Sequence, residues 1–177
     1  MNQQYLIYIW LASIVVALSG CVSAYHHTDA WNAESPLEQG KSVIISIPED
    51  GRYGGDVYRN SGEMTSEAVK LAFSRYSSNV EITDEYKTID SIRSKLPGHY
   101  AYFVEPSILH WEERATEWSG KPDRIEIQIQ VYDVVSGLEI FRRIYSGKSK
   151  WATFGGGHPQ DLLPEPTQKF VDSLYNQ

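Results

Sequence analysis

Apolar and polar positions change their spacing several times along the chain, and each change predicts a different element. Residues 41–48 are β-branched and almost continuously apolar, which is typical of a strand buried on both faces of a sheet. Over 61–77 the apolar residues instead recur every three or four positions, which predicts a helix. A short strand at 80–82 and a second helix at 89–96 follow. This part of the chain therefore predicts a right-handed β-α-β unit with parallel strands.

The second half of the chain alternates with a period of two. Apolar residues occupy every second position of 124–131, so one face of a strand at 124–132 is expected in the core. A turn at 133–137 reverses the chain, and 138–146 returns antiparallel. A long strand at 100–113 precedes this hairpin, and a last helix follows Pro164. The predicted fold class is α/β (α+β), a mixed sheet with an N-terminal β-α-β part, a C-terminal antiparallel meander, and helices packed on the sheet.

Two loops invite a more specific interpretation. The glycine-rich loop at 49–60 lacks the spacing of a phosphate-binding loop, but Asn60 and Glu63 have the spacing of a capping box for the helix that follows. Residues 146–149 end like a phosphate-binding loop, although Arg142 stands where its first glycine must lie. The sequence therefore predicts no nucleotide site.

The N-terminus carries an uncharged apolar run at 5–18. A membrane-spanning helix needs about 20 apolar residues, whereas the apolar core of a secretory signal has about 7–15. Ser19, Gly20 and Cys21 follow this run, and Cys21 is the only cysteine, so no intramolecular disulfide can form. The pattern predicts a cleaved export signal; the alternative is an uncleaved signal anchor, since residues 1–10 contain no Lys or Arg.

The tetrapeptide Leu18-Ser19-Gly20-Cys21 resembles the lipobox of bacterial lipoproteins. The resemblance implies cleavage between Gly20 and Cys21 and a diacylglyceryl thioether on Cys21, a step that requires a nucleophilic thiol. Two or three acyl chains make a stable membrane anchor. The next residue is Val22 and not Asp, which by the same resemblance implies sorting to the outer membrane, with the protein facing the periplasm.

Three segments are expected. Residues 1–20 are a lipoprotein signal peptide, residues 21–40 a flexible tether with a reach of about 25 Å, and residues 41–177 a single periplasmic domain. His26, His27 and Asp29 lie in the predicted tether, which would not hold ligands in a fixed geometry. The sequence therefore predicts no metal site there.

The net charge of −7 changes the range of partners that are expected. An acidic chain without a Lys/Arg cluster argues against nucleic acid and against an anionic membrane surface as electrostatic partners. No cofactor motif is present, so no cofactor is expected.

Residues 108–126 and 158–163 resemble the signature of a family of bacterial lipoproteins that is known only as a domain of unknown function. More distantly, the order of elements resembles the periplasmic domain of the curli-secretion lipoprotein and the lipoproteins that activate penicillin-binding proteins. That second resemblance concerns the fold and implies little about function. The family brings no catalytic residues to this chain.

Acidic residues in the same block allow an enzymatic interpretation. Glu112, Glu113, Glu117 and Asp123 could supply a glycosidase pair, which needs two carboxylates about 5–9 Å apart. His110 and Glu112 lie two positions apart on one strand face, where they could bind a metal or exchange protons. No Cys-x-x-Cys, Gly-x-Ser-x-Gly or His-Glu-x-x-His motif supports either chemistry. A solvated strand face is the preferred interpretation, and we expect no catalytic residues.

Aromatic and basic residues in this block suggest binding instead. Tryptophan and arginine are enriched at interface hot spots, and the loop at 114–123 is long for a hairpin connection. We therefore nominate Trp111, Arg114, Trp118 and Lys121 as a protein contact surface; alternatively, Trp111 is a core residue and Trp118 covers a sheet edge. The favoured function is a non-catalytic binding or assembly module of the bacterial envelope. The alternatives are a peptidoglycan-directed hydrolase and a carrier of a small apolar ligand.

Overall fold

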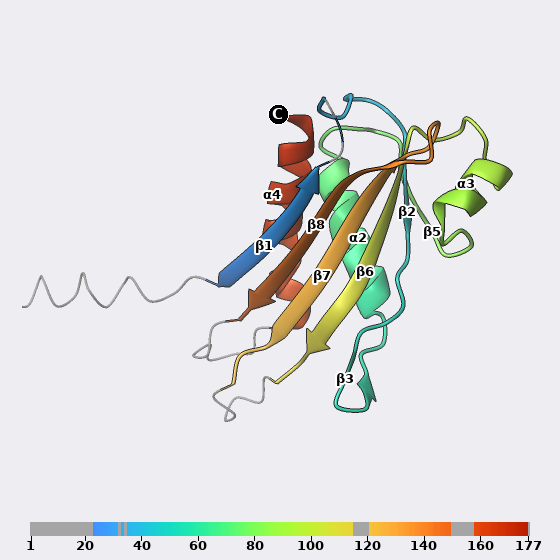
Figure 1. Cartoon of the computed structure of the whole chain (residues 1–177). Helices are drawn as coiled ribbons and strands as arrows, with labels where there is room; N and C mark the ends of the chain where they lie inside the picture. Colours follow the sequence, from blue (N-terminus) through green and yellow to red (C-terminus); the bar gives the residue numbers. More distant parts are fainter. Residues whose placement is uncertain (1–22, 32, 34, 115–120, 150–157, 177) are drawn as a thin grey trace, which may run out of the picture.

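A computed structural model describes residues 23–31, 33, 35–114, 121–149 and 158–176. In chain order the elements are β1 (Ala24–Trp31), β2 (Val43–Ser46), β3 (Arg52–Tyr53), β4 (Asp56–Val57), α2 (Ser61–Phe73), β5 (Val80–Thr83), α3 (Ile89–Lys95), β6 (Tyr102–Glu112), β7 (Arg124–Asp133), β8 (Glu139–Lys148), the short 3₁₀ helix η1 (Pro159–Leu162) and α4 (Pro164–Tyr175). Six strands form one sheet in the order β1-β8-β7-β6-β2-β5, and β3 and β4 form a separate hairpin (Figure 1).

The sheet has a parallel part and an antiparallel part. β2 pairs in parallel with both β5 and β6, whereas β6, β7, β8 and β1 pair antiparallel in succession. The predicted mixed sheet, with a β-α-β part followed by a meander, is confirmed. Gly137 has φ 74° in the turn between β7 and β8, as a left-handed turn position requires.

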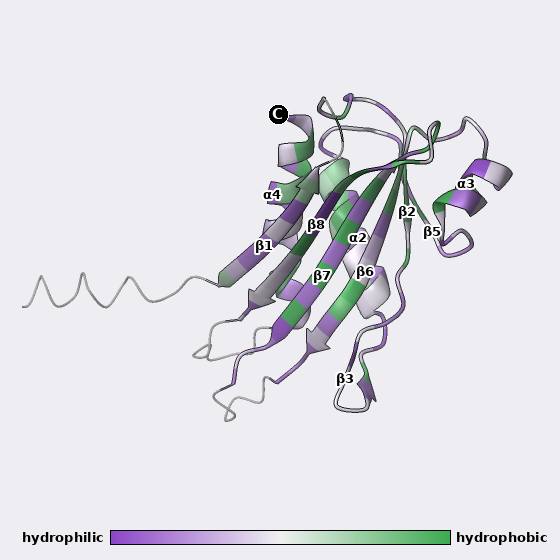
Figure 2. Ribbon diagram, viewed as in Figure 1, coloured by the Kyte–Doolittle hydropathy of each residue, from purple (hydrophilic) through white to green (hydrophobic). Residues whose placement is uncertain are grey.

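Helices α2 and α4 cover one face of the sheet, which we call the helix-covered face (Figure 1). Figure 2 shows the alternation of hydrophobic and hydrophilic residues along β7 that this covering requires. Ile125, Ile127, Ile129 and Val131 lie in the main core, and the residues between them face the other side, the open face. The predicted facing of this strand is confirmed.

A smaller apolar cluster lies on the open face beneath α3. Ile44 of β2 and Phe103 of β6 meet Ile92 of α3 and Val134 of the hairpin turn there. Val43 and Ile45 of β2 point instead into the main core. β2 is therefore buried on both faces, which explains its continuous apolar sequence.

The expectation of a flexible tether over 21–40 is wrong for Ala24–Trp31, which form the edge strand β1. β1 pairs with β8 along its whole length, from Ala24 opposite Lys148 to Trp31 opposite Phe141. Its core-facing contacts include an ion pair between Asp29 and Arg143 and an edge-on contact of 5.0 Å between the rings of Trp31 and Phe141. Because polar groups supply much of this contact, the strand lacks the apolar alternation by which strands are recognised.

The N-terminus of α2 is capped by a residue that is distant in sequence. Asn60 has φ 68° and makes no side-chain capping bond, so the predicted capping box with Glu63 is wrong. Asp50 takes that role, because its carboxylate accepts the N–H groups of Asn60 at 3.2 Å and Gly62 at 3.0 Å. A Cβ on Gly62 would lie 2.3 Å from the carbonyl oxygen of Pro48, which explains why glycine stands in this first turn.

Replacing the distant cap should therefore weaken the fold more than replacing the predicted one. We expect Asp50→Ala to lower the free energy of unfolding by about 1–2 kcal/mol, as loss of a helix cap does. Glu63→Ala, in the same helix turn, should lower it by less than about 0.5 kcal/mol because no cap is lost. Urea unfolding followed by circular dichroism measures both values, and a larger effect of Glu63→Ala would contradict the assignment.

Candidate functional site

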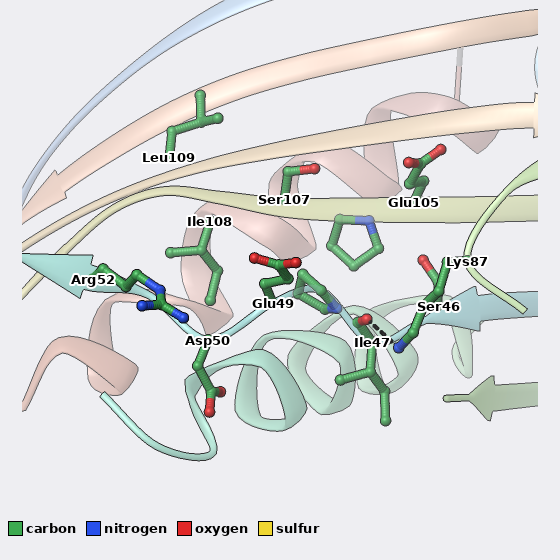
Figure 3. A pocket seen from close by; sticks show the side chains of 12 residues that line it. Ser46, Ile47, Glu49, Asp50, Arg52, Lys87, Glu105, Ser107, Ile108 and Leu109 are labelled. Carbon is green, nitrogen blue, oxygen red and sulfur yellow. Dashed lines mark hydrogen bonds between the residues drawn. The ribbon is translucent and has the colours of Figure 1, made fainter. Parts of the chain in front are cut away.

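A crevice opens where the short strand β2 leaves the long strand β6. The ladder between them ends at Ile45 opposite Val104, after which the chain turns towards the β3–β4 hairpin while β6 continues to Glu112. The space between has a volume of about 550 Å³ (Figure 3). The crevice is lined by residues 46–50 and Arg52 on one side and by residues 105–109 of β6 on the other. Lys87 completes the lining.

Charges of both signs line this crevice. Arg52 and Lys87 supply positive charge, and Glu49 and Glu105 supply negative charge beside them. The Lys87 ammonium donates to the carbonyl oxygen of Ile47 at 2.7 Å. Burial raises the pKa of Glu105 above its ordinary value, a hydrogen bond from Tyr132 opposes this rise, and the nearby carboxylate of Glu139 adds to it. An open crevice with charged walls differs from the closed apolar cavity that a carrier of apolar ligands requires.

A second polar cluster lies at the far end of β6, around the buried carboxylate of Glu112. This side chain is 2% exposed, and one of its oxygens forms an ion pair with Arg114 Nε. His110 Nε2 lies 3.4 Å from the other oxygen. The Arg114 guanidinium also donates to the Tyr53 hydroxyl at 3.3 Å, and the Tyr53 ring meets the His110 ring edge-on at 5.0 Å.

These contacts determine the protonation state of Glu112. Burial alone would raise its pKa, but hydrogen bonds from Arg114, Tyr53 and His110 outweigh burial and hold the pKa below the ordinary value of 4.5. A carboxylate held in its ionised form by three donors is a poor general acid, because it carries no proton to give at neutral pH. The cluster therefore has the character of a buried structural ion pair.

The lowered pKa gives Glu112 a predictable effect on stability. A lowered folded-state pKa contributes stability that is complete above the ordinary value and is lost as the pH falls through the folded-state value. We therefore expect Glu112→Gln to be clearly less stable than wild type at pH 7, with the difference shrinking below about pH 4.5. Glu113→Gln, an exposed neighbour, should stay within about 0.5 kcal/mol of wild type at pH 7. Urea unfolding at a series of pH values tests this, and a difference for Glu112→Gln that does not change with pH would contradict it.

The other acidic candidates are also engaged with neighbours. Glu113 lies 3.0 Å from His158, and the fully buried Asp123 accepts the backbone N–H of Arg114 at 2.7 Å. Asp123 thereby ties the two ends of the β6–β7 connection together. Glu117 lies outside the described residues. In the part of the chain that the structure describes, no group of three or more His, Cys, Asp or Glu side chains could hold a metal ion.

The nominated contact residues have different positions in the structure. Trp111 is 2% exposed and belongs to the main core. It packs so closely on Gly51 that a Cβ added to Gly51 would lie 2.5 Å from the Cβ of Trp111. The nomination of Trp111 as a surface contact is therefore wrong, because its side chain lies on the helix-covered face of the sheet. Arg114 is partly exposed and bound to Glu112 and Tyr53, and Lys121 is exposed. Trp118, Gly20 and Cys21 lie outside the described residues.

The crevice was not predicted from the sequence, although one signal for it was present. The strand predicted at 41–48 is much shorter than the one predicted at 100–113, and neighbouring strands of unequal length leave part of the longer one unpaired. The described helices give one further finding, since none of them is long and apolar enough to cross a membrane.

The fold is similar to that of proteins whose structures are known. PelC from Paraburkholderia phytofirmans, solved as a dodecamer, matches with a TM-score of 0.67 at 11% identity, over 87% of this chain and 100% of that one. Protein XCC0632 from Xanthomonas campestris matches with a TM-score of 0.51 at 12% identity, over 82% of this chain and 90% of that one. At such identities the likeness concerns the fold alone.

The family is established separately. The chain belongs to the family described as a domain of unknown function, DUF4823, whose model matches residues 35–174. This confirms the family resemblance seen in residues 108–126 and 158–163. No protein with a curated description matches the chain.

Proposed function

We propose that this protein is a non-catalytic binding module of the bacterial envelope, anchored by lipid on Cys21 to the outer membrane and facing the periplasm. We further propose that the crevice beside β6 holds an extended segment of a protein partner. The observation that carries this proposal is the stretch of β6 beyond Val104, which borders an open crevice after its ladder with β2 has ended.

The chemistry of the crevice fits a peptide better than an apolar small molecule. An exposed sheet edge offers main-chain groups to an extended segment, and the side chains around it provide specificity. Pro106 has no N–H, so this stretch of β6 cannot form a continuous ladder, and we expect side chains to provide much of the recognition. Arg52, Lys87, Glu49 and Glu105 can pair with charges of either sign, and the half-exposed Leu109 offers an apolar contact.

The hydrolase alternative is supported less well by the same geometry. A retaining or inverting glycosidase needs one carboxyl group that keeps its proton beside one that does not. Glu112 is buried and held ionised by Arg114, while Glu113 and Asp123 are each bound to a neighbour. The described carboxylates of this block therefore act within the fold.

Two exposed leucines make a matched test of the binding proposal. Leu109 lines the crevice and is 50% exposed, whereas Leu71 is 69% exposed on α2, away from the crevice. With a photo-crosslinking amino acid at each position in turn, we expect a discrete crosslinked product in intact cells from position 109 and none from position 71. Equal products from both positions, or none from 109, would contradict the assignment of the crevice.

The mass of the product distinguishes two kinds of partner. A product of twice the chain's mass would indicate a second copy, in line with the dodecamer that PelC forms. Any other discrete mass would identify a different protein of the envelope. Leu109→Asp should abolish the partner-dependent product from a neighbouring crevice position such as Ser107, while Leu71→Asp should leave it unchanged.

A further inference from the structure

The distance between the proposed lipid anchor and the folded domain is short. β1 begins at Ala24, three residues after Cys21. At most about 3.6 Å per residue, this spacer spans no more than about 11 Å. A tether over 21–40 would allow the domain to tumble at a distance, whereas a strand that begins at Ala24 holds one end of the sheet beside the anchor.

The residues that share this end are determined by the strand register. Ala24 of β1 lies opposite Lys148 of β8, Lys148 opposite Arg124 of β7, and Arg124 opposite Glu112 of β6. Four strand ends therefore form one row, seen at the lower left of the sheet in Figure 1. We call this row, together with the exposed Lys121 just before β7, the anchor end.

Among the described residues of the anchor end, the exposed and partly exposed charges are positive, although the whole chain carries −7. Lys148 and Lys121 are exposed, and Arg124 is partly exposed on the same row. Of the acidic residues beside this row, Glu112 is paired with Arg114 and Asp123 is fully buried, while Glu113 is exposed and lies 3.0 Å from His158. Anionic lipid headgroups attract basic residues held within a Debye length of the membrane surface.

We propose that the anchor end lies against the bilayer and contacts anionic phospholipid headgroups, so that the sheet stands on end at the membrane. This proposal rests on the lipid anchor at Cys21 and adds the orientation of the domain and the surface that meets the lipid. The hairpin tip at Val135 lies at the other end of the strands, about 30 Å away at 3.3 Å per residue.

Single introduced cysteines can measure this orientation, because lipidation uses the only native thiol. The mature lipidated protein, with either Glu113→Cys at the anchor end or Val135→Cys at the far end, is labelled with a fluorophore and inserted into vesicles. Both positions are exposed. The vesicles contain phosphatidylethanolamine, phosphatidylglycerol and a lipid with a quencher on its headgroup. We expect several-fold stronger quenching at position 113 than at 135, and equal quenching or the reverse order would overturn the proposal.

A charge-reversal pair tests the contact with anionic headgroups. Lys148→Glu should reduce the quenching at position 113 in vesicles with phosphatidylglycerol, while Lys95→Glu, the same change on the exposed end of α3, should not. No difference between these variants would overturn the headgroup contact. The intact mass of the protein, measured before labelling, reports lipidation separately. A chain without lipid would therefore disprove the anchor itself and would not be mistaken for a wrong orientation.

Discussion

Ile127→Asp is expected to prevent the protein from folding. Ile127 is fully buried at the centre of the sheet, between Ile108 of β6 and Tyr145 of β8 on the helix-covered face. An unpaired carboxylate at this position would cost several kcal/mol, against a total stability of about 5–15 kcal/mol for an ordinary domain. Circular dichroism and the yield of soluble protein measure the loss.

The neighbouring residue is the matched control for this prediction. Gln128 points to the open face, where its side chain donates to Gln130 at 2.7 Å. Gln128→Asp introduces the same side chain one position further along the strand, and we expect the variant to fold with a melting temperature within a few degrees of wild type. A soluble Ile127→Asp variant that melts at the wild-type temperature would mean that the facing of β7 is wrong.

Cys21→Ala is expected to abolish lipid attachment completely. No other residue of the chain carries a thiol, so no alternative site for the thioether exists. The precursor should keep residues 1–20, because the lipobox resemblance implies cleavage directly before Cys21. Radiolabelled palmitate and the intact mass of the chain report the two steps separately.

A change outside the lipobox is the control for lipid attachment. Ser23→Ala alters a small residue two positions beyond Cys21 and should leave both labelling and cleavage at wild-type levels. Palmitate that still enters the Cys21→Ala variant would show that the lipobox interpretation is mistaken. A variant that is cleaved without label would instead indicate an ordinary export signal.

The elements that the sequence predicted correctly are those whose signal is local. β7 shows one apolar residue at every second position, and β2 is apolar throughout because both of its faces are covered. Gly137 marks the tight turn between β7 and β8 by its freedom to adopt positive φ. In each case the environment of a residue follows from its position among its immediate neighbours along the chain, so the pattern of residue types reports that environment directly.

The candidate site was only partly predictable, for a related reason. Arg114 was nominated for a surface contact because of its residue type, yet it lies partly exposed beside the buried carboxylate of Glu112 and the hydroxyl of Tyr53. Trp111 was nominated for the same reason and proved to be a core residue that packs against Gly51. Residue type alone does not say which face of a strand receives a side chain once a bulge, here between Ile108 and His110, has shifted the register.

By itself, the sequence determined the mixed sheet and the family, because periodicity and a contiguous block of residues carry that information. Only the tertiary structure decided the rest. β1 pairs with β8, and its Asp29 meets Arg143 across the sheet edge, while α2 is capped by Asp50 from an earlier loop. The crevice exists because β6 is longer than its neighbour β2 and continues after their ladder has ended. Each of these features depends on groups that are far apart in sequence and are brought together only by the fold, so no local pattern could have shown them.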